Sequence, residues 1–301
     1  MVGIYNDMAS ITKAVITAGG YATRFLPITK AVPKEMLPLG DKPVIHYILQ
    51  ELQSAGITDV LLLIGRGRES LMNYLDKNYE VDDYLQRRAA ETQDAVPVTV
   101  TTNFFGNMNL YFRRVPLPQG VADCVKHAAS FVADEPFVLA YCDDVFFDGN
   151  PTTEMLTAYG QTGKPVIIAS PVAWADAHRY GIITASGQII EKPRKPTSNL
   201  VAVGRYLLPA GFCQNLGTDM VEALNQIPKK TIVTTQAKRF DTGNKYGFFQ
   251  AFQHVMQTQA NVKAWFHKLL NKSFHKFDFI IHIVQVGLNH LLNQFFGMAV
   301  G

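Results

Sequence analysis

The fold is decided by the segment Lys13-Ala-Val-Ile-Thr-Ala-Gly-Gly-Tyr-Ala-Thr-Arg-Phe-Leu-Pro-Ile-Thr-Lys-Ala-Val-Pro-Lys-Glu-Met-Leu-Pro38. Its apolar residues 14–16 predict a buried strand. The turn Ala18-Gly19-Gly20 has almost no side chains, so its backbone N–H groups can approach an anionic ligand closely. A loop follows in which prolines fix φ and hold cations in place; these cations are Arg24, Lys30 and Lys34. The combination favours a polyphosphate ligand over the alternative, a solvated basic loop.

Composition and charge exclude several classes of protein. The chain has 301 residues, of which 48% are hydrophobic, enough for one large α/β domain or two small ones. A net charge of +3 is too small to indicate nucleic acid as a partner. Residues 1–7 include an acid and lack a long apolar core, so we expect no signal peptide, and no apolar run reaches membrane-spanning length. The three isolated cysteines lead us to expect a reducing, cytoplasmic environment.

Apolar strands alternate with helices, an order typical of an α/β protein with a mostly parallel sheet. Residues 43–56 have helical spacing, with proline near the start and glycine at the end. Residues 59–64 and 137–141 are expected to be buried strands, and residues 180–208 antiparallel strands. We also expect helices over 69–88, 121–133, 151–160, 218–226 and 246–257, strands over 96–100 and 165–170, and an irregular insertion over 103–110.

The same pattern predicts three parts of the chain. Residues 1–12 are expected to form an N-terminal arm and residues 13–260 a single domain. Residues 261–301 are expected to form an apolar, helical tail.

Carboxylates at the end of one predicted strand indicate a metal site. Asp143 and Asp144 follow the strand 137–141, and ligands bind at the carboxyl ends of strands in open α/β sheets. Paired carboxylates suit a hard cation such as Mg2+, although they could also cap the following segment. Asp241, in the sequence Asp241-Thr-Gly, could complete such a site, but the same tripeptide is also an ordinary turn.

Other residue types point to no covalent chemistry. Lys192, in Glu191-Lys192-Pro193, could meet a phosphate as a point charge, or it could mark a charged hairpin exit. The histidines have no metal-ligand spacing. No Gly-x-Ser-x-Gly, P-loop or dinucleotide fingerprint occurs.

Taken together, these stretches resemble the sugar-1-phosphate nucleotidylyltransferases, most closely the bacterial UTP–glucose-1-phosphate uridylyltransferases. The strongest match is the segment 19–38 with the following Asp41-Lys-Pro43. Further matches occur in the family's order, and together they span residues 13 to 258. They are Gly65-Arg-Gly-Arg68, Asp143-Asp144, Tyr180-Gly181, Ile190-Glu-Lys-Pro193, Ser198-Asn-Leu-Val-Ala-Val-Gly-Arg-Tyr206 and Arg239-Phe-Asp-Thr-Gly243.

The resemblance implies a Rossmann-like nucleotide-diphospho-sugar transferase fold, with a mixed, mostly parallel sheet flanked by helices and a small antiparallel sugar-side portion. It implies that UTP and glucose 1-phosphate give UDP-glucose and pyrophosphate, with Mg2+ as cofactor. It also implies a homo-oligomer, while the charge and hydropathy of the chain lead us to expect neither nucleic-acid nor membrane partners. The alternatives left open are a thymidylyltransferase that uses dTTP, a nucleotide-sugar-binding homologue with impaired catalysis, and a scaffold or obligate oligomer built by the tail.

The resemblance also implies roles for individual residues. Arg24, Lys34 and Lys192 would be catalytic, with Arg24 and Lys34 on the triphosphate and Lys192 on the sugar phosphate. Asp143 and Asp241 would coordinate Mg2+. Gly181, Glu191 and Lys192 would bind the sugar. The nucleotide would be bound by Ala18, Gly19, Gly20, Glu35, Gly120 and Asp144.

Four positions depart from the family pattern. Ala22 stands where glycine is usual, and if that position needs a positive φ, alanine there costs about 1 kcal/mol or more. Arg114 and Val115 stand where a glutamine commonly meets the uracil. Cys142 replaces a glycine before the aspartates, and the segment at Gly217-Thr-Asp219 is shortened.

Overall fold

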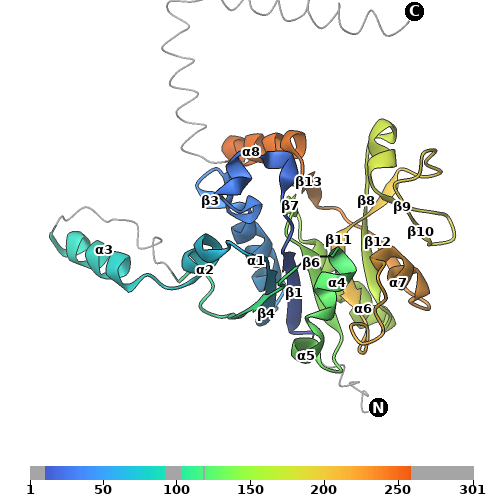
Figure 1. Ribbon diagram of the computed structural model, residues 1–301, viewed down its shortest axis with the longest axis horizontal. Coiled ribbons are helices and arrows are strands. Elements are labelled where there is room, and N and C mark those ends of the chain that lie inside the picture. Colours follow the sequence, from blue (N-terminus) through green and yellow to red (C-terminus); the bar gives the residue numbers. More distant parts are fainter. Residues whose placement is uncertain (1–10, 92–102, 118, 259–301) are drawn as a thin grey trace, which may run out of the picture. The chain divides into compact units, whose positions relative to one another are not determined.

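The computed structural model describes residues 11–91, 103–117 and 119–258 (Figure 1). The chain divides into compact units of residues 1–251 and 252–301. Only residues 252–258 of the second unit are described, and they belong to helix α8 (Lys245–Thr258). Most of the expected arm, the strand expected over 96–100 and the expected tail lie outside the described residues.

A mixed, mostly parallel sheet forms the centre of the first unit. Its core consists of β1 (Lys13–Ala18), flanked in parallel by β4 (Asp59–Ile64) and β6 (Phe137–Tyr141). The path through the sheet is β10-β9-β11-β6-β1-β4-β5, with β8 also paired to β11 and β12 paired to β8. The remaining strands are β5 (Asn109–Arg114), β8 (Val166–Pro171), β9 (Gly181–Ile183), β10 (Ile189–Glu191), β11 (Leu200–Leu208) and β12 (Thr231–Thr234).

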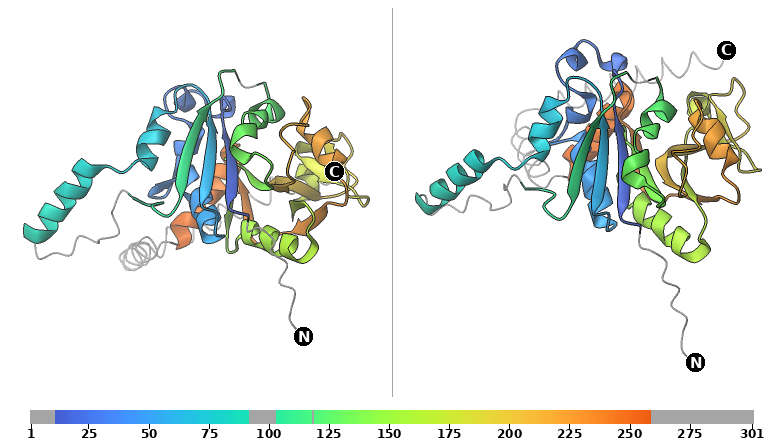
Figure 2. Two further views of the ribbon diagram at one scale, coloured as in Figure 1. Left: turned by 90° about the horizontal axis from the view of Figure 1, so that it is seen from below. Right: turned by 60° about the horizontal axis from the view of Figure 1, so that its bottom comes forward.

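Helices cover both faces of this sheet (Figure 2). Because successive strand residues face opposite sides, the continuous apolar runs of β1 and β4 are buried on both faces. Val15, Leu61 and Leu63 share one core with residues of the helices that follow β5. The helices are α1 (Val44–Ser54), α2 (Glu69–Leu75), α3 (Tyr79–Glu91), α4 (Val121–Lys126), α5 (Ala129–Val132), α6 (Pro151–Thr162) and α7 (Met220–Gln226).

Short elements complete the fold. The basic loop after β1 contains three 3₁₀ turns, η1 (Thr23–Phe25), η2 (Ile28–Lys30) and η3 (Lys34–Met36), and a further turn, η4 (Trp174–Arg179), precedes β9. Strands β2 (Pro38–Leu39) and β3 (Lys42–Pro43) form a small hairpin before α1. The described part of the chain contains no helix long and apolar enough to cross a membrane.

The structure corrects three details of the expected elements. The helix expected over 69–88 is broken between α2 and α3, because Asp76 adopts an extended conformation. The helix expected over 121–133 is divided into α4 and α5 and ends at Ala133, which has a positive φ of 49°. The irregular insertion expected over 103–110 gives way to strand β5 at Asn109, an exposed edge strand whose sequence lacks an apolar run.

A two-stranded antiparallel ribbon brings distant carboxylates together. It pairs β7 (Asp144–Phe147) with β13 (Lys238–Asp241), and its register places Asp241 opposite Asp144. Since β7 follows β6 after a turn of two residues, the ribbon carries Asp241 to the carboxyl end of the central strands.

Candidate active site

A cavity of about 700 Å³ opens at the carboxyl ends of β1 and β6. Its walls come from the glycine turn, the start of α4, strands β9 and β10, helix α7 and the ribbon. Most of the residues expected at the site line it: Gly19, Gly20, Arg24, Lys34, Gly120, Asp143, Asp144, Gly181, Glu191, Lys192 and Asp241. Ala18 and Glu35 are fully buried outside the cavity lining.

Arg68 holds the glycine turn from behind. Its Nη2 donates to the carbonyl of Gly20 at 2.7 Å, and its Nε donates to the carbonyl of Ala18 at 3.2 Å. A β-carbon on Gly65 would lie 2.9 Å from the Gly19 carbonyl oxygen, so only glycine lets the end of β4 approach the turn so closely. The resemblance included Gly65-Arg-Gly-Arg68 among its motifs, and the structure gives this motif a supporting position.

Ala22 adopts the left-handed conformation that its position in the turn suggests. Its φ is 51° and its ψ 40°, and its carbonyl accepts a hydrogen bond of 2.9 Å from Thr29 Oγ1. The following turn η1 carries Arg24, whose Nη1 donates to the carbonyl of Gly243 at 3.3 Å. Arg24 therefore bridges the basic loop and the segment after β13 despite the strained alanine.

Lys34 and Asp143 form an ion pair inside the cavity, with 2.6 Å between Nζ and Oδ2. Burial alone would raise the pKa of Asp143, but the charge and hydrogen bond of Lys34 outweigh burial and lower it. Burial opposes the charge on Lys34, but the electrostatic effect of the surrounding Cys142, Asp143 and Glu35 outweighs burial and raises its pKa. Both groups are therefore charged at neutral pH.

Asp143 and Asp241 converge on the same point near Gly243. A β-carbon on Gly243 would lie 2.8 Å from Asp143 Oδ2 and 3.0 Å from Asp241 Oδ1. In this structure Asp143 Oδ2 is paired with Lys34, and Asp241 Oδ1 accepts from the backbone N–H of Gly243 at 2.9 Å. Two convergent carboxylates suit Mg2+, which is usually held by one or two carboxylates together with water and substrate phosphates. Within the described residues, no group of three or more His, Cys, Asp or Glu side chains could hold a metal ion, so phosphate or water oxygens would have to complete the coordination.

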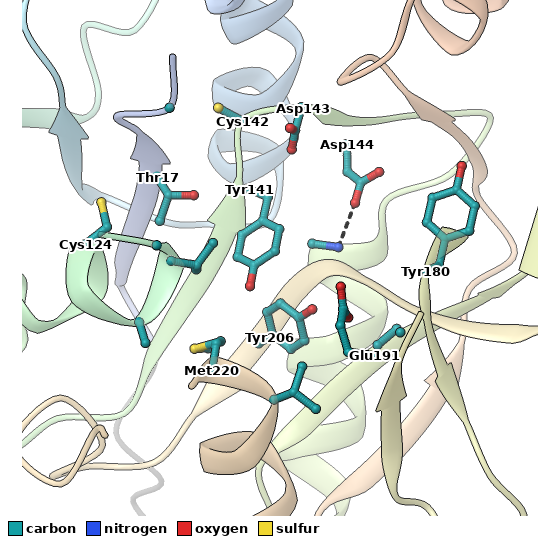
Figure 3. Close-up of a pocket in the computed structure, with 18 of the residues that line it drawn as sticks. Thr17, Cys124, Tyr141, Cys142, Asp143, Asp144, Tyr180, Glu191, Tyr206 and Met220 are labelled. Atoms are coloured by element: carbon teal, nitrogen blue, oxygen red, sulfur yellow. Dashed lines mark hydrogen bonds between the residues drawn. The ribbon is translucent and has the colours of Figure 1, made fainter. Parts of the chain in front are cut away.

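Asp144 lines the cavity, but protein groups occupy its carboxylate. Its Oδ1 accepts bonds from Arg239, at 2.6 Å from Nη2 and 2.7 Å from Nε. Its Oδ2 accepts from the backbone N–H of Gly204 at 2.8 Å, the bond drawn as a dashed line in Figure 3. This geometry ties β7 to β13 and β11. The nucleotide contact of Asp144, which the resemblance implies, stays a prediction for a residue that lines the cavity.

Glu35 also lies behind the site. One carboxylate oxygen, Oε1, accepts from the Cys142 thiol at 3.3 Å, and the other, Oε2, lies 3.5 Å from Arg68 Nε. Its side chain points into the protein because η3 directs Lys34 to the cavity and Glu35 to the core. Glu35 thus connects the arginine behind the glycine turn with the residue before Asp143, and the expected contact with nucleotide does not follow from this position.

The turn between β6 and β7 is clamped by the buried Arg205, which the sequence reasoning did not single out. Its guanidinium donates to the carbonyls of Tyr141 at 3.2 Å and Asp144 at 3.0 Å. Glu51 accepts from it through both oxygens, at 2.9 and 2.8 Å. The sequence did hold a sign of this role: Arg205 is the single charged residue in the apolar run 200–208, and a buried arginine requires a partner.

The opposite wall consists of β9 and β10. Glu191 is paired with Gly181, and a β-carbon on Gly181 would lie 3.0 Å from Glu191 Oε2. Lys192 Nζ lies 2.7 Å from Glu191 Oε1, and its backbone has a positive φ of 43°. A strained backbone of this kind often accompanies a functional position. The Tyr180 hydroxyl donates to Asp241 Oδ2 at 3.1 Å, which joins this wall to the carboxylates.

Comparison with known proteins establishes the family. Residues 13–258 match the nucleotidyl transferase family, and the chain belongs to it. A relative from Staphylococcus saprophyticus, UTP–glucose-1-phosphate uridylyltransferase 2, is 34% identical over 265 residues, which cover 80% of this chain and 90% of the relative.

Solved structures agree with the family. A UTP-bound UGPase from Acinetobacter baumannii has a TM-score of 0.76 at 28% identity, covering 86% of this chain and 98% of that one. A UDP-glucose pyrophosphorylase complexed with UDP-glucose has a TM-score of 0.69 at 26% identity, covering 83% and 100%. The expected fold and family are thereby confirmed.

Proposed function

We propose that this nucleotidyltransferase transfers the uridylyl group of UTP to glucose 1-phosphate, giving UDP-glucose and pyrophosphate. The observation that carries the proposal is the convergence of Lys34, Asp143 and Asp241 beside the glycine turn, with Lys192 on the opposite wall. The names of the similar uridylyltransferases support the choice of UTP and glucose 1-phosphate.

In this proposal, an oxygen of the sugar phosphate attacks the α-phosphorus of UTP in line and pyrophosphate leaves. Such transfers depend mainly on positioning and on neutralising charge, so no side-chain nucleophile is required. Arg24 and Lys34 would bind the triphosphate and the leaving pyrophosphate, and Lys192 would bind the incoming phosphate. Asp143 and Asp241 would hold Mg2+, which when bound would neutralise negative charge on the phosphate oxygens.

The selectivity for the base of the nucleotide concerns other residues than the phosphate and metal contacts. Val115 is fully buried in the core beside β4, and neither Arg114 nor Val115 lines the cavity. These two residues therefore leave no counterpart of the family's glutamine at the cavity, while Gly120 does line it. Comparing pyrophosphate release from UTP and dTTP with the same sugar phosphate distinguishes a uridylyltransferase from the thymidylyltransferase alternative.

The turn at Ala22 bears on the alternative of a binding protein with impaired catalysis. The left-handed alanine keeps Arg24 in the cavity, which favours an active enzyme. If calorimetry detected binding of UDP-glucose while the synthetic reaction gave no product, the impaired homologue would be the better account.

The metal assignment predicts the effect of two isosteric variants. We expect Asp143→Asn and Asp241→Asn each to lower Mg2+-dependent pyrophosphate release by about 100-fold or more, since each removes a carboxylate that would hold the Mg2+ whose charge stabilises the transferring group. Chelation of Mg2+ should abolish turnover of the unmodified enzyme. Asp83→Asn, on the exposed face of α3, is the matched control. Full activity in either site variant would refute the role of that residue.

Two further expectations concern the protein as a whole. We infer a cytoplasmic enzyme, since the three cysteines of the chain are free and buried. We also expect a homo-oligomer, which sedimentation of the full chain would detect as a mass above 33.5 kDa.

A further inference from the structure

Tyr141 lines the cavity, and none of the sequence motifs described above includes it. It is the last residue of β6, two residues before Asp143, and its side chain lines the cavity. A β-carbon on Gly204 would lie 2.5 Å from the Tyr141 β-carbon, so the neighbouring strand β11 leaves the space that this residue occupies. The local backbone is therefore built to admit a tyrosine here.

Tyr141 is paired with Tyr206 of β11. Their ring centroids are 5.5 Å apart with an angle of 56° between the planes. Figure 3 shows the Tyr141 hydroxyl directed away from Asp143 and toward Tyr206, whose own hydroxyl points toward Glu191. The two hydroxyls thus lie between Asp143 and Glu191, the residue that the resemblance assigns to the sugar.

This pair retains hydrogen-bonding capacity for a ligand. Each tyrosine hydroxyl can donate one hydrogen bond and accept others, so the two tyrosines that line the cavity can bind a polar ligand group. Much of the neighbouring cavity wall is apolar, with Met220, Leu224 and Ile189 among the lining residues. A polar ligand group that enters this part of the cavity would therefore find the tyrosine hydroxyls on an otherwise apolar floor.

The surroundings indicate which ligand group this is. Tyr141 and Tyr206 line the cavity together with Asp143 and Glu191. The glycine turn and Gly120, which the nucleotide is expected to contact, are on other elements of the lining. A ring hydroxyl close to the sugar's own phosphate suits the space between Asp143 and Glu191.

We propose that Tyr141 is a specificity-determining residue for the sugar phosphate, and that its hydroxyl, together with that of Tyr206, binds one ring hydroxyl of the sugar. This inference rests on the proposed function and adds to the roles of Gly181, Glu191 and Lys192, which the family resemblance already implies. It concerns recognition of the sugar and leaves the triphosphate contacts unchanged.

The test is steady-state kinetics with Tyr141→Phe, which removes the hydroxyl and keeps the ring. We expect KM for glucose 1-phosphate to rise about five-fold, equivalent to about 1 kcal/mol for one neutral hydrogen bond, while KM for UTP stays the same. Tyr111→Phe, which removes the hydroxyl of a half-exposed tyrosine on β5 outside the cavity, is the matched control.

A panel of monodeoxyglucose 1-phosphates makes the test sharper. The unmodified enzyme should use the analogue that lacks the bound hydroxyl less well than glucose 1-phosphate. Tyr141→Phe should lose this preference and should still discriminate against the analogues that lack other hydroxyls. Tyr206→Phe should show the same selective loss, and it provides the answer if Tyr141→Phe does not fold.

The outcomes separate this inference from the proposed function. If the unmodified enzyme uses no sugar phosphate, the proposed function itself fails. If that enzyme is active but the variants keep its KM for glucose 1-phosphate and its pattern across the panel, Tyr141 has no part in sugar recognition. A rise in KM for UTP with no change for the sugar would also overturn the inference.

Discussion

Ala22 shows how a single residue in the polyphosphate loop carries strain. Its left-handed backbone costs an alanine about 1–2 kcal/mol, whereas a glycine adopts it freely but loses more entropy on folding. We expect Ala22→Gly to raise the free energy of unfolding by about 0.5–1 kcal/mol, measured by urea titration. Ala31→Gly, at a right-handed position in the same loop, should lower it. Equal effects from both substitutions would contradict the strain assigned to Ala22.

His46 couples stability to pH at the residue scale. It is buried on α1, its Nδ1 lies 2.7 Å from the Tyr74 hydroxyl, and aromatic rings surround it. Burial lowers the pKa of His46 from 6.5 to about 4. The unfolded chain therefore takes up a proton on His46 at a higher pH than the folded protein does. The folded state keeps its full stability with respect to His46 above pH 6.5 and loses stability as the pH falls toward 4.

The measurement is the free energy of unfolding at pH 7 and pH 5. We expect the unmodified protein to lose more stability over this interval than His46→Gln, since glutamine does not titrate. An identical loss in both proteins would show that other groups govern this pH range.

At the scale of elements, Arg205 joins α1 to the turn that carries Asp143. Removing its guanidinium leaves Glu51 as an unpaired buried charge, and breaking a buried pair in this way typically costs 3–5 kcal/mol. We expect Arg205→Met to lose about that much in urea titration. The double variant Arg205→Met/Glu51→Gln should recover part of the loss because the orphaned charge is gone. No recovery would indicate that the carbonyl contacts of Arg205 outweigh its ion pair.

The elements also show what periodicity could and could not predict. Strands β1, β4 and β6 were predictable because continuous apolar runs are buried on both faces. The ribbon of β7 and β13 was not, because each strand has only four residues and the pairing is set by contacts distant in sequence. The same holds for the break between α2 and α3, since nothing in the charge pattern of residues 69–88 marks it.

For the whole molecule, the residues that line the cavity were more predictable than the contacts that support them. Glycines, lysines and aspartates in fixed motifs identified the cavity walls, because phosphate and metal recognition requires those residue types. The sequence could not show that the carboxylates of Asp144 and Glu35 bind protein groups, because the side chains of neighbouring residues point in different directions where the backbone turns. Tyr141 and Tyr206 are likewise paired across strands, and neither sits in a pattern that reveals the contact.

The central claim is the transfer of a uridylyl group to glucose 1-phosphate, and the direct measurement is conversion of labelled glucose 1-phosphate to UDP-glucose with release of pyrophosphate. We predict that both products appear in equal amounts when UTP, glucose 1-phosphate and Mg2+ are all present, and that omission of any one of them stops the reaction. Pyrophosphate release without the sugar phosphate, or no labelled UDP-glucose at saturating substrates, would contradict this account.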